Sequence, residues 1–228
     1  MHKIFELFLK DLESHRKGQE RTSTEEYHVN CWRTCKAIST SIEKLKMAEE
    51  YVRLSYKFIP SDKESNIGDY IEFHIENYMI RSRAVYDRVL IFTNCLCDIG
   101  TSKEYINHNA IINNQKVIKF GLEAKLRSIN KACSTYRTSR NTIIHHDKYE
   151  NKNLEWITVA NQARGLLGDD YEKILGISEE TIISNTAWVI TEHMKEFDQN
   201  TNNIVSAVDH FLDTAFEIYR HNSEAELH

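Results

Sequence analysis

The residues of this 228-residue chain that are best suited to chemistry lie close together, between Arg137 and His145. Asn141 and His145 are four positions apart, so on a helix their side chains share one face, and Arg137 precedes them on that face by one turn. Arg140 is displaced by about 100° round the helix, an angle that its long side chain can partly span. The spacing therefore predicts that arginine, asparagine and histidine can converge on one small anionic group.

These residue types suit the cleavage of a phosphodiester. A guanidinium group can hold two phosphate oxygens and stabilise the charge that develops on them. His145 can take a proton from a ribose 2′-hydroxyl or donate one to the leaving oxygen, because imidazole titrates near neutrality. Asn141 can fix the imidazole tautomer or orient the phosphate. The surrounding segment, residues 116–148, holds eight basic and two acidic residues, whereas residues 149–228 hold five basic and 15 acidic ones, so a polyanion could be attracted locally.

A structural interpretation of the same residues stays open. The apolar positions 118, 122, 126, 129, 133 and 136 follow a helical period that next reaches Arg140. On such a stripe Arg140 would pair with a core acid such as Asp87, and His145 and His146 would interact with the C-terminal end of the helix, where a cation contributes about 0.3–1 kcal/mol. The basic segment could likewise pack against the acidic tail instead of binding an anion.

The composition favours long helices. The chain has one proline and seven glycines, where average usage would give about eleven and sixteen. This shortage of turn residues argues against a β-sandwich or barrel. A hydrophobic content of 41% and a net charge of −5 argue against disorder. We predict an all-α protein folded as one domain over residues 1–228, an antiparallel helical bundle with an additional N-terminal helix and a long C-terminal helix.

The periodicity of apolar residues places the helices. Residues 150–168 could form a short helix or an extended piece, and residues 61–68 form the clearest loop. The predicted helices span about residues 3–16, from Thr24 to before Pro60, 69–98, from Ile112 through Tyr136 towards Ile143, and 178–221.

Other chemistries find little support. The chain lacks the GxGxxG, GxxxxGK[ST], GxSxG and HExxH motifs. Its five cysteines have no zinc-like CxxC spacing and are odd in number, which predicts reduced core thiols. A di-iron site would need more than the single Glu25-x-x-His28 motif, so we expect no metal and no cofactor. No apolar run approaches the ~20 residues that span a bilayer, and the N-terminus lacks a secretory pattern, so we expect a cytoplasmic protein that does not contact a membrane.

The segment Arg140-Asn141-x-x-x-His145, near the end of a late helix in an all-helical chain, resembles the R-x(4–6)-H signature of the HEPN superfamily, the higher eukaryotes and prokaryotes nucleotide-binding domains. A polar residue directly after the arginine is the variant common in its ribonuclease branch. The helix that contains residues 78–87 is similar to the partner helix of bacterial HEPN proteins. The resemblance covers residues 70–222, which would form a core of four to five helices, with residues 1–60 as an N-terminal elaboration.

The resemblance implies a homodimer that places two R-x4-H motifs across a shared cleft. Active members are metal-independent endoribonucleases that leave a 2′,3′-cyclic phosphate and a 5′-hydroxyl. Many serve as toxins or phage-defence effectors, sometimes with a nucleotidyltransferase-type antitoxin. On this chain Arg140 would hold the RNA phosphate, His145 would be the acid or base, and Asn141 would orient the phosphate. Supporting contacts would come from Arg137, His146, Asp87 and Arg83. A non-catalytic HEPN-like module that binds a nucleotide or a protein stays open as an alternative.

Overall fold

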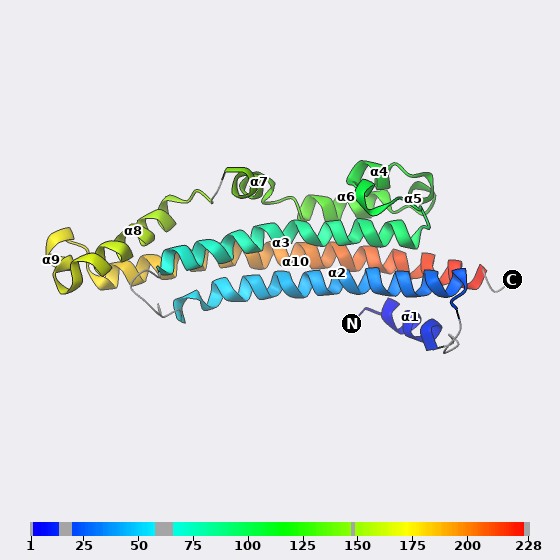
Figure 1. Ribbon diagram of the computed structural model, residues 1–228, viewed down its shortest axis with the longest axis horizontal. Coiled ribbons are helices and arrows are strands. Elements are labelled where there is room, and N and C mark those ends of the chain that lie inside the picture. The colour runs from blue at the N-terminus through cyan, green and yellow to red at the C-terminus, as the bar shows by residue number, and fades with distance from the viewer. Residues whose placement is uncertain (1, 14–19, 58–65, 147–148, 226–228) are drawn as a thin grey trace. The chain divides into compact units, whose positions relative to one another are not determined.

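The computed structural model describes residues 2–13, 20–57, 66–146 and 149–225, and every regular element within them is a helix (Figure 1). The three longest are α2 (Ser23–Arg53), α3 (Ile67–Leu96) and α10 (Glu179–Ala225). The shorter ones are α1 (Ile4–Glu13), α4 (His108–Ile112), α5 (Gln115–Lys119), α6 (Glu123–Ala132), α7 (Arg137–His146), α8 (Lys152–Leu167) and α9 (Tyr171–Leu175), with single 3₁₀ turns at Leu54–Lys57, Lys103–Tyr105 and Gly168–Asp170. The predicted all-α helical class is confirmed.

Most of the predicted helices are found close to their expected ends. Residues 69–98 correspond to α3 and residues 178–221 to α10. The ambiguous segment 150–168 is a helix, α8, because the Asn151 side chain caps it by accepting hydrogen bonds from the backbone N–H groups of Asn153 (3.0 Å) and Leu154 (3.2 Å). Pro60 and most of the predicted loop lie outside the described residues.

The single long helix predicted from Ile112 onwards is wrong. The chain forms α5, α6 and α7 there instead. Gly121, between α5 and α6, has a φ of 66°, in the left-handed region that favours glycine and ends a helix. After α6, the Thr135 hydroxyl donates to the carbonyl of Ala132 (2.9 Å), a local hydrogen bond that competes with helix continuation. Arg140 therefore does not continue the apolar stripe of α6, and its orientation is set by α7 alone.

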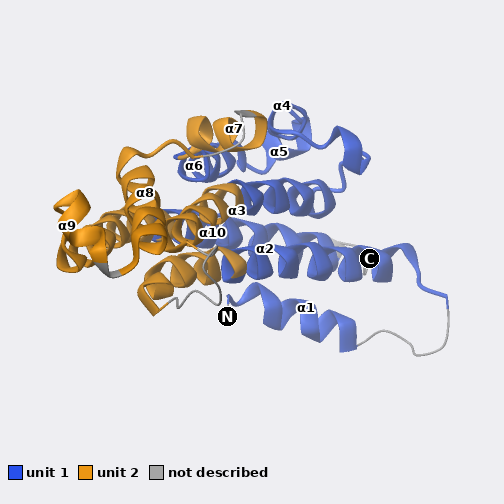
Figure 2. Ribbon diagram, turned by 60° about the vertical axis from the view of Figure 1, so that its left-hand side comes forward, with its two compact units in different colours: residues 1–43, 83–135, 202–228 blue, residues 44–82, 136–201 orange. Residues whose placement is uncertain are grey.

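Contacts divide the chain into two compact units (Figure 2). Unit 1 contains residues 1–43, 83–135 and 202–228, and unit 2 contains residues 44–82 and 136–201. The helices α2, α3 and α10 each supply a segment to both units.

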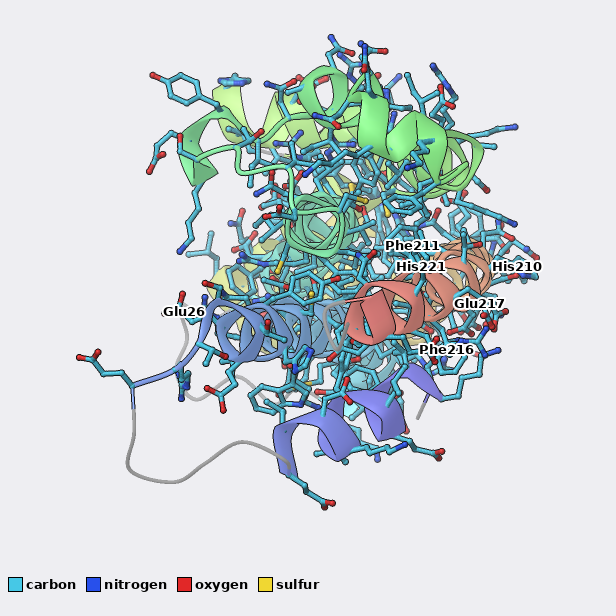
Figure 3. The ribbon with its side chains drawn as sticks, turned by 90° about the vertical axis from the view of Figure 1, so that its right-hand side faces the viewer. Glu26, His210, Phe211, Phe216, Glu217 and His221 are labelled. Carbon is cyan, nitrogen blue, oxygen red and sulfur yellow. The ribbon has the colours of Figure 1, made fainter. Side chains whose placement is uncertain are left out.

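Aromatic side chains fill the core of unit 1. Phe8 of α1 packs edge-to-face on Tyr219 of α10 and on Phe92 of α3, with ring centroids 4.6 and 6.5 Å apart. Phe92 in turn packs on Phe211 of α10 at 6.0 Å. Figure 3 shows Phe211 on the inner side of α10, whereas His210 lies on its outer side. These contacts bury one stripe of each helix, as an amphipathic bundle requires.

The long helices do not all alternate in direction. In unit 1, Cys31 of α2 lies opposite Cys95 of α3, and in unit 2 the ring of Tyr51 lies opposite that of His74, so α2 and α3 are antiparallel. Tyr78 of α3 contacts Phe197 of α10, and Phe92 of α3 contacts Phe211 of α10. Residue numbers therefore increase in the same direction along both helices, so α3 and α10 are parallel. Among the described residues, six short helices lie between them in the chain and make this parallel pairing possible.

In unit 2 the start of α3 approaches α8 closely. Asn66 accepts a hydrogen bond from the backbone N–H of Gly68 (2.7 Å) and donates one to the carbonyl of Thr158 (2.8 Å). A Cβ atom at position 68 would lie 2.9 Å from the backbone nitrogen of Thr158, so glycine is required for this approach.

A buried polar network joins α2, α3 and α10 in unit 2. Glu49 is 8% exposed, and its Oε2 accepts a hydrogen bond from the Thr201 hydroxyl (2.7 Å), which also contacts the Tyr78 hydroxyl (2.9 Å). Its Oε1 lies 3.6 Å from Arg53, which also pairs with Asp198 at 3.1 Å. Burial, together with a hydrogen bond to Asp198, raises the pKa of Glu49 to about 7.

We therefore expect stability to depend on the protonation of Glu49. Its pKa rises from 4.5 to about 7 on folding, so between these pH values the folded protein binds more protons than the unfolded chain, and the free energy of unfolding falls as the pH rises. We expect the free energy of unfolding to fall by about 1–2 kcal/mol over this pH range. This is less than the full pKa shift of Glu49 would give, because solvent screens the half-exposed Arg53 and Asp198. Urea unfolding at pH 5 and pH 7.5 measures this difference.

The matched variants are Glu49→Gln and Glu50→Gln. Glutamine at 49 keeps an acceptor for Thr201 but cannot titrate, so this contribution to the pH dependence should disappear. Glu50 contacts Arg53 from the surface (3.1 Å), and its replacement should leave the pH dependence in place. If the stability of Glu49→Gln depends on pH as that of the wild type does, other groups cause this dependence.

Candidate functional site

Helix α7 carries the predicted motif and is attached to unit 2 by the residue that precedes it. The Tyr136 ring packs edge-to-face on Tyr78 of α3 (5.9 Å) and on Phe197 of α10 (5.6 Å). The carbonyl of Tyr136 accepts the first helical hydrogen bond of α7, from the N–H of Arg140 (2.8 Å). Burial raises the pKa of Tyr136, so its phenol stays neutral. The ring contacts of Tyr136 thus hold the start of α7 against α3 and α10 of unit 2.

Most of the motif residues lie on the solvent-exposed face of α7. Arg137, Asn141 and His145 are all exposed and follow one another at intervals of four, on one helical face. Arg140 is half-buried beside this face, and its Nη1 donates to Asn141 Oδ1 over 3.4 Å. The structure therefore brings together on one short helix the residues that the sequence predicts to converge on an anion.

The supporting residues are placed differently. His146 is the last residue of α7, and its side chain lies outside the described residues. Asp87 is not a core acid: its side chain is 58% exposed and pairs with Arg83 of the same helix (3.5 Å). Arg83 and Asp87 belong to unit 1, whereas α7 belongs to unit 2. The structural interpretation in which Arg140 pairs with Asp87 as a core acid is therefore not supported, because Asp87 is exposed.

Arg83 is held at the surface of unit 1 by several contacts. Its Nη1 donates to Asn130 Oδ1 (2.6 Å) and to the Ser134 hydroxyl (3.3 Å) of the segment around α6. Its guanidinium carbon lies 4.8 Å from the centre of the Tyr86 ring, a cation–π contact. The guanidinium group is thus fixed in orientation, as a residue that positions an anion would need to be.

A histidine that the sequence analysis did not single out lies in the same region. The Tyr86 hydroxyl contacts His108 Nδ1 over 2.6 Å. Burial and the positive charges of Arg127 and Arg83 lower the pKa of His108, so its imidazole is neutral at physiological pH. His108 opens the short helix α4 after a polar connection, where no apolar period marks it, so only its tertiary contacts identify it.

The part of the chain that the structure describes offers neither a metal site nor a membrane span. Within it, no group of three histidine, cysteine or acidic side chains is arranged to hold a metal ion. None of its helices is both long and apolar enough to cross a membrane.

The sequence match that decides the family covers this site. Residues 27–219 match the model of the Cthe2314-like HEPN family. The chain belongs to the HEPN superfamily. Membership gives this HEPN protein a nucleotide- or RNA-related function at the level of the superfamily. No curated protein and no solved structure matches the chain.

The matched range bears on the predicted domain limits. It begins at Tyr27, inside α2, and thus includes most of the segment described above as an N-terminal elaboration. It also contains α7 with Arg140, Asn141 and His145. The limits 1–60 and 70–222 stay predictions.

Proposed function

We propose that this HEPN protein is a metal-independent endoribonuclease whose reacting groups lie on α7. The observation that supports it is the joint exposure of Arg137, Asn141 and His145 on one face, with Arg140 beside them, in a chain of the HEPN superfamily. An exposed helical face with a guanidinium group and an imidazole, and a second guanidinium group beside it, suits an RNA phosphate, which needs both charge stabilisation and proton transfer.

The proposed reaction breaks one bond and forms another at the same phosphorus. His145 takes the proton of the ribose 2′-hydroxyl, whose oxygen then attacks the phosphorus while the bond to the 5′-oxygen of the next nucleotide breaks. Arg140 stabilises the negative charge on the phosphoryl oxygens, and Asn141 orients the phosphate or the imidazole. The products are a 2′,3′-cyclic phosphate and, once the leaving oxygen gains a proton, a 5′-hydroxyl.

This chemistry favours a homodimer with a composite cleft. An in-line displacement needs a base at the 2′-oxygen and an acid at the 5′-oxygen, on opposite sides of the phosphorus. In the proposed site each chain supplies one acid or base, His145, so a second copy would supply the other group. The partners we propose are therefore RNA and a second copy of this chain.

The end groups of the RNA products test the proposed reaction. Purified protein would be incubated with structured and single-stranded RNA in EDTA, and the new ends would be identified by mass spectrometry. We expect 2′,3′-cyclic phosphates and 5′-hydroxyls. Cleavage that requires a divalent ion, or that leaves 5′-phosphates, would contradict the proposed chemistry, and a complete lack of cleavage across the RNA panel would favour the non-catalytic binding module.

Mixing experiments test the composite cleft. We expect inactive His145→Ala chains, refolded together with wild-type chains in increasing excess, to lower activity in proportion to the fraction of wild-type homodimers. If instead activity simply follows the amount of wild-type chain, each copy acts alone and the shared cleft is wrong.

We further propose that the protein acts as a toxin or phage-defence effector, held inactive by a nucleotidyltransferase-type antitoxin. Expression in bacteria should then arrest growth, and His145→Ala should relieve the arrest. Arrest of equal strength by both chains would show that any toxicity does not come from RNA cleavage at α7.

A further inference from the structure

Two cysteines from different helices meet inside unit 1. The sulfur of Cys31 on α2 lies 3.5 Å from the sulfur of Cys95 on α3, although the residues are 64 positions apart in the chain. A disulfide has a sulfur–sulfur distance of about 2.0 Å. The two side chains would therefore need to move only a little closer together for a disulfide to form.

The two thiols differ in their access to solvent. Cys31 is fully buried, whereas Cys95 is partly exposed and lines a cavity of about 410 Å³. Polar side chains make up much of its wall, among them Asn30 and Thr34 of α2. Glu26, which is labelled in Figure 3, lines the same cavity from the start of α2. A small uncharged oxidant can thus reach Cys95 and not Cys31.

The pKa values of the two thiols also favour Cys95 as the more reactive one. A hydrogen bond from Cys31, assisted by one from Thr34 and by the charge of Arg33, lowers the pKa of Cys95 in spite of its burial. Burial raises the pKa of Cys31, which therefore stays protonated and donates. Burial also raises the pKa of Cys35 to about 12. Cys95 is thus the thiol with the greater thiolate character.

We propose that Cys95 and Cys31 form a reversible redox pair, in which a peroxide oxidises Cys95 and Cys31 completes a disulfide. The Cys95 thiolate attacks one oxygen of the peroxide, a sulfur–oxygen bond forms, the oxygen–oxygen bond breaks, and hydroxide or an alkoxide leaves and is protonated. The Cys31 sulfur then attacks the resulting sulfenic acid, loses its proton, and water leaves. Two thiols are oxidised, one peroxide is reduced, and a dithiol reverses the process by exchange.

Thiol titration and peptide mapping test the cross-link. Native protein would be treated with hydrogen peroxide, alkylated in denaturant, and digested without reductant. We expect three of the five thiols to remain alkylated and the peptides of Cys31 and Cys95 to be joined within one chain. Dithiothreitol should restore all five. A disulfide between chains, a different intrachain pair, or direct over-oxidation of Cys95 with no link to Cys31 would each overturn the proposal.

Single variants separate the attacking thiol from the resolving one. In Cys31→Ser, a sulfenic acid should accumulate at Cys95 and be trapped by dimedone, whereas Cys95→Ser should slow peroxide-dependent thiol loss at least tenfold. Cys35→Ser removes a buried thiol that is not part of the pair and should form the disulfide at the wild-type rate. Far-UV circular dichroism identifies any variant that fails to fold, and for these the more conservative replacement with alanine serves instead. Dimedone adducts at Cys31 in place of Cys95 would overturn the assigned order.

Discussion

Replacing His145 with alanine should lower the rate of RNA cleavage by about 10²–10⁴-fold, the usual contribution of a positioned acid or base. The side chain is exposed at the end of a short helix, so its loss removes a reacting group without removing a core contact. The free energy of unfolding should change by about 0.5 kcal/mol or less. Single-turnover cleavage of a labelled RNA measures the rate, and urea unfolding measures the stability.

His210→Ala is the matched control. His210 is also an exposed histidine on a helix, as Figure 3 shows, but it lies on α10 in unit 1. Cleavage by this variant should equal that of the wild type. Arg140→Lys keeps the charge but loses the planar pair of donors, so we expect an intermediate loss of rate. If His145→Ala and His210→Ala cleave RNA equally fast, the site on α7 is wrong even if the protein is a ribonuclease.

Replacing Phe197 with alanine should destabilise unit 2 by about 3–5 kcal/mol. Phe197 is fully buried on α10, and its ring stacks on that of Tyr78 with centroids 3.7 Å apart. The same ring supports Tyr136, the anchor of α7, at 5.6 Å. A cavity at this position removes packing between α10, α3 and the residue that precedes α7. The shift of the urea midpoint at constant slope measures the loss.

Ile183→Ala on the same helix is the control for this prediction. Ile183 is 60% exposed, so its truncation should cost about 0.5 kcal/mol or less. Because Phe197 supports Tyr136, RNA cleavage by Phe197→Ala should fall even at temperatures where the variant is still folded, and Ile183→Ala should cleave normally. A Phe197→Ala protein that is as stable as Ile183→Ala would show that this aromatic contact is not part of the core.

Local sequence was enough to predict the long helices α3 and α10 and the shared face of the motif. Apolar spacing within α3 and α10 located both helices, because each period is set by residues a few positions apart. The grouping of Asn141 with His145 was likewise predictable, since it depends only on the geometry of one helical turn. The position of Arg140 was not, because its predicted stripe assumed a helix that Gly121 and the turn after Ala132 interrupt.

The sequence by itself determined that this protein is helical, that it carries an R-x4-H motif, and which family matches it. Only the tertiary structure decided the environments that adjust its chemistry. The contact of Cys31 with Cys95 joins residues 64 positions apart, and the raised pKa of Glu49 depends on its burial and on Asp198 of another helix. Burial and close contact between distant segments set the acidity and reactivity of these side chains. Neither can be recognised from a periodic pattern in the sequence.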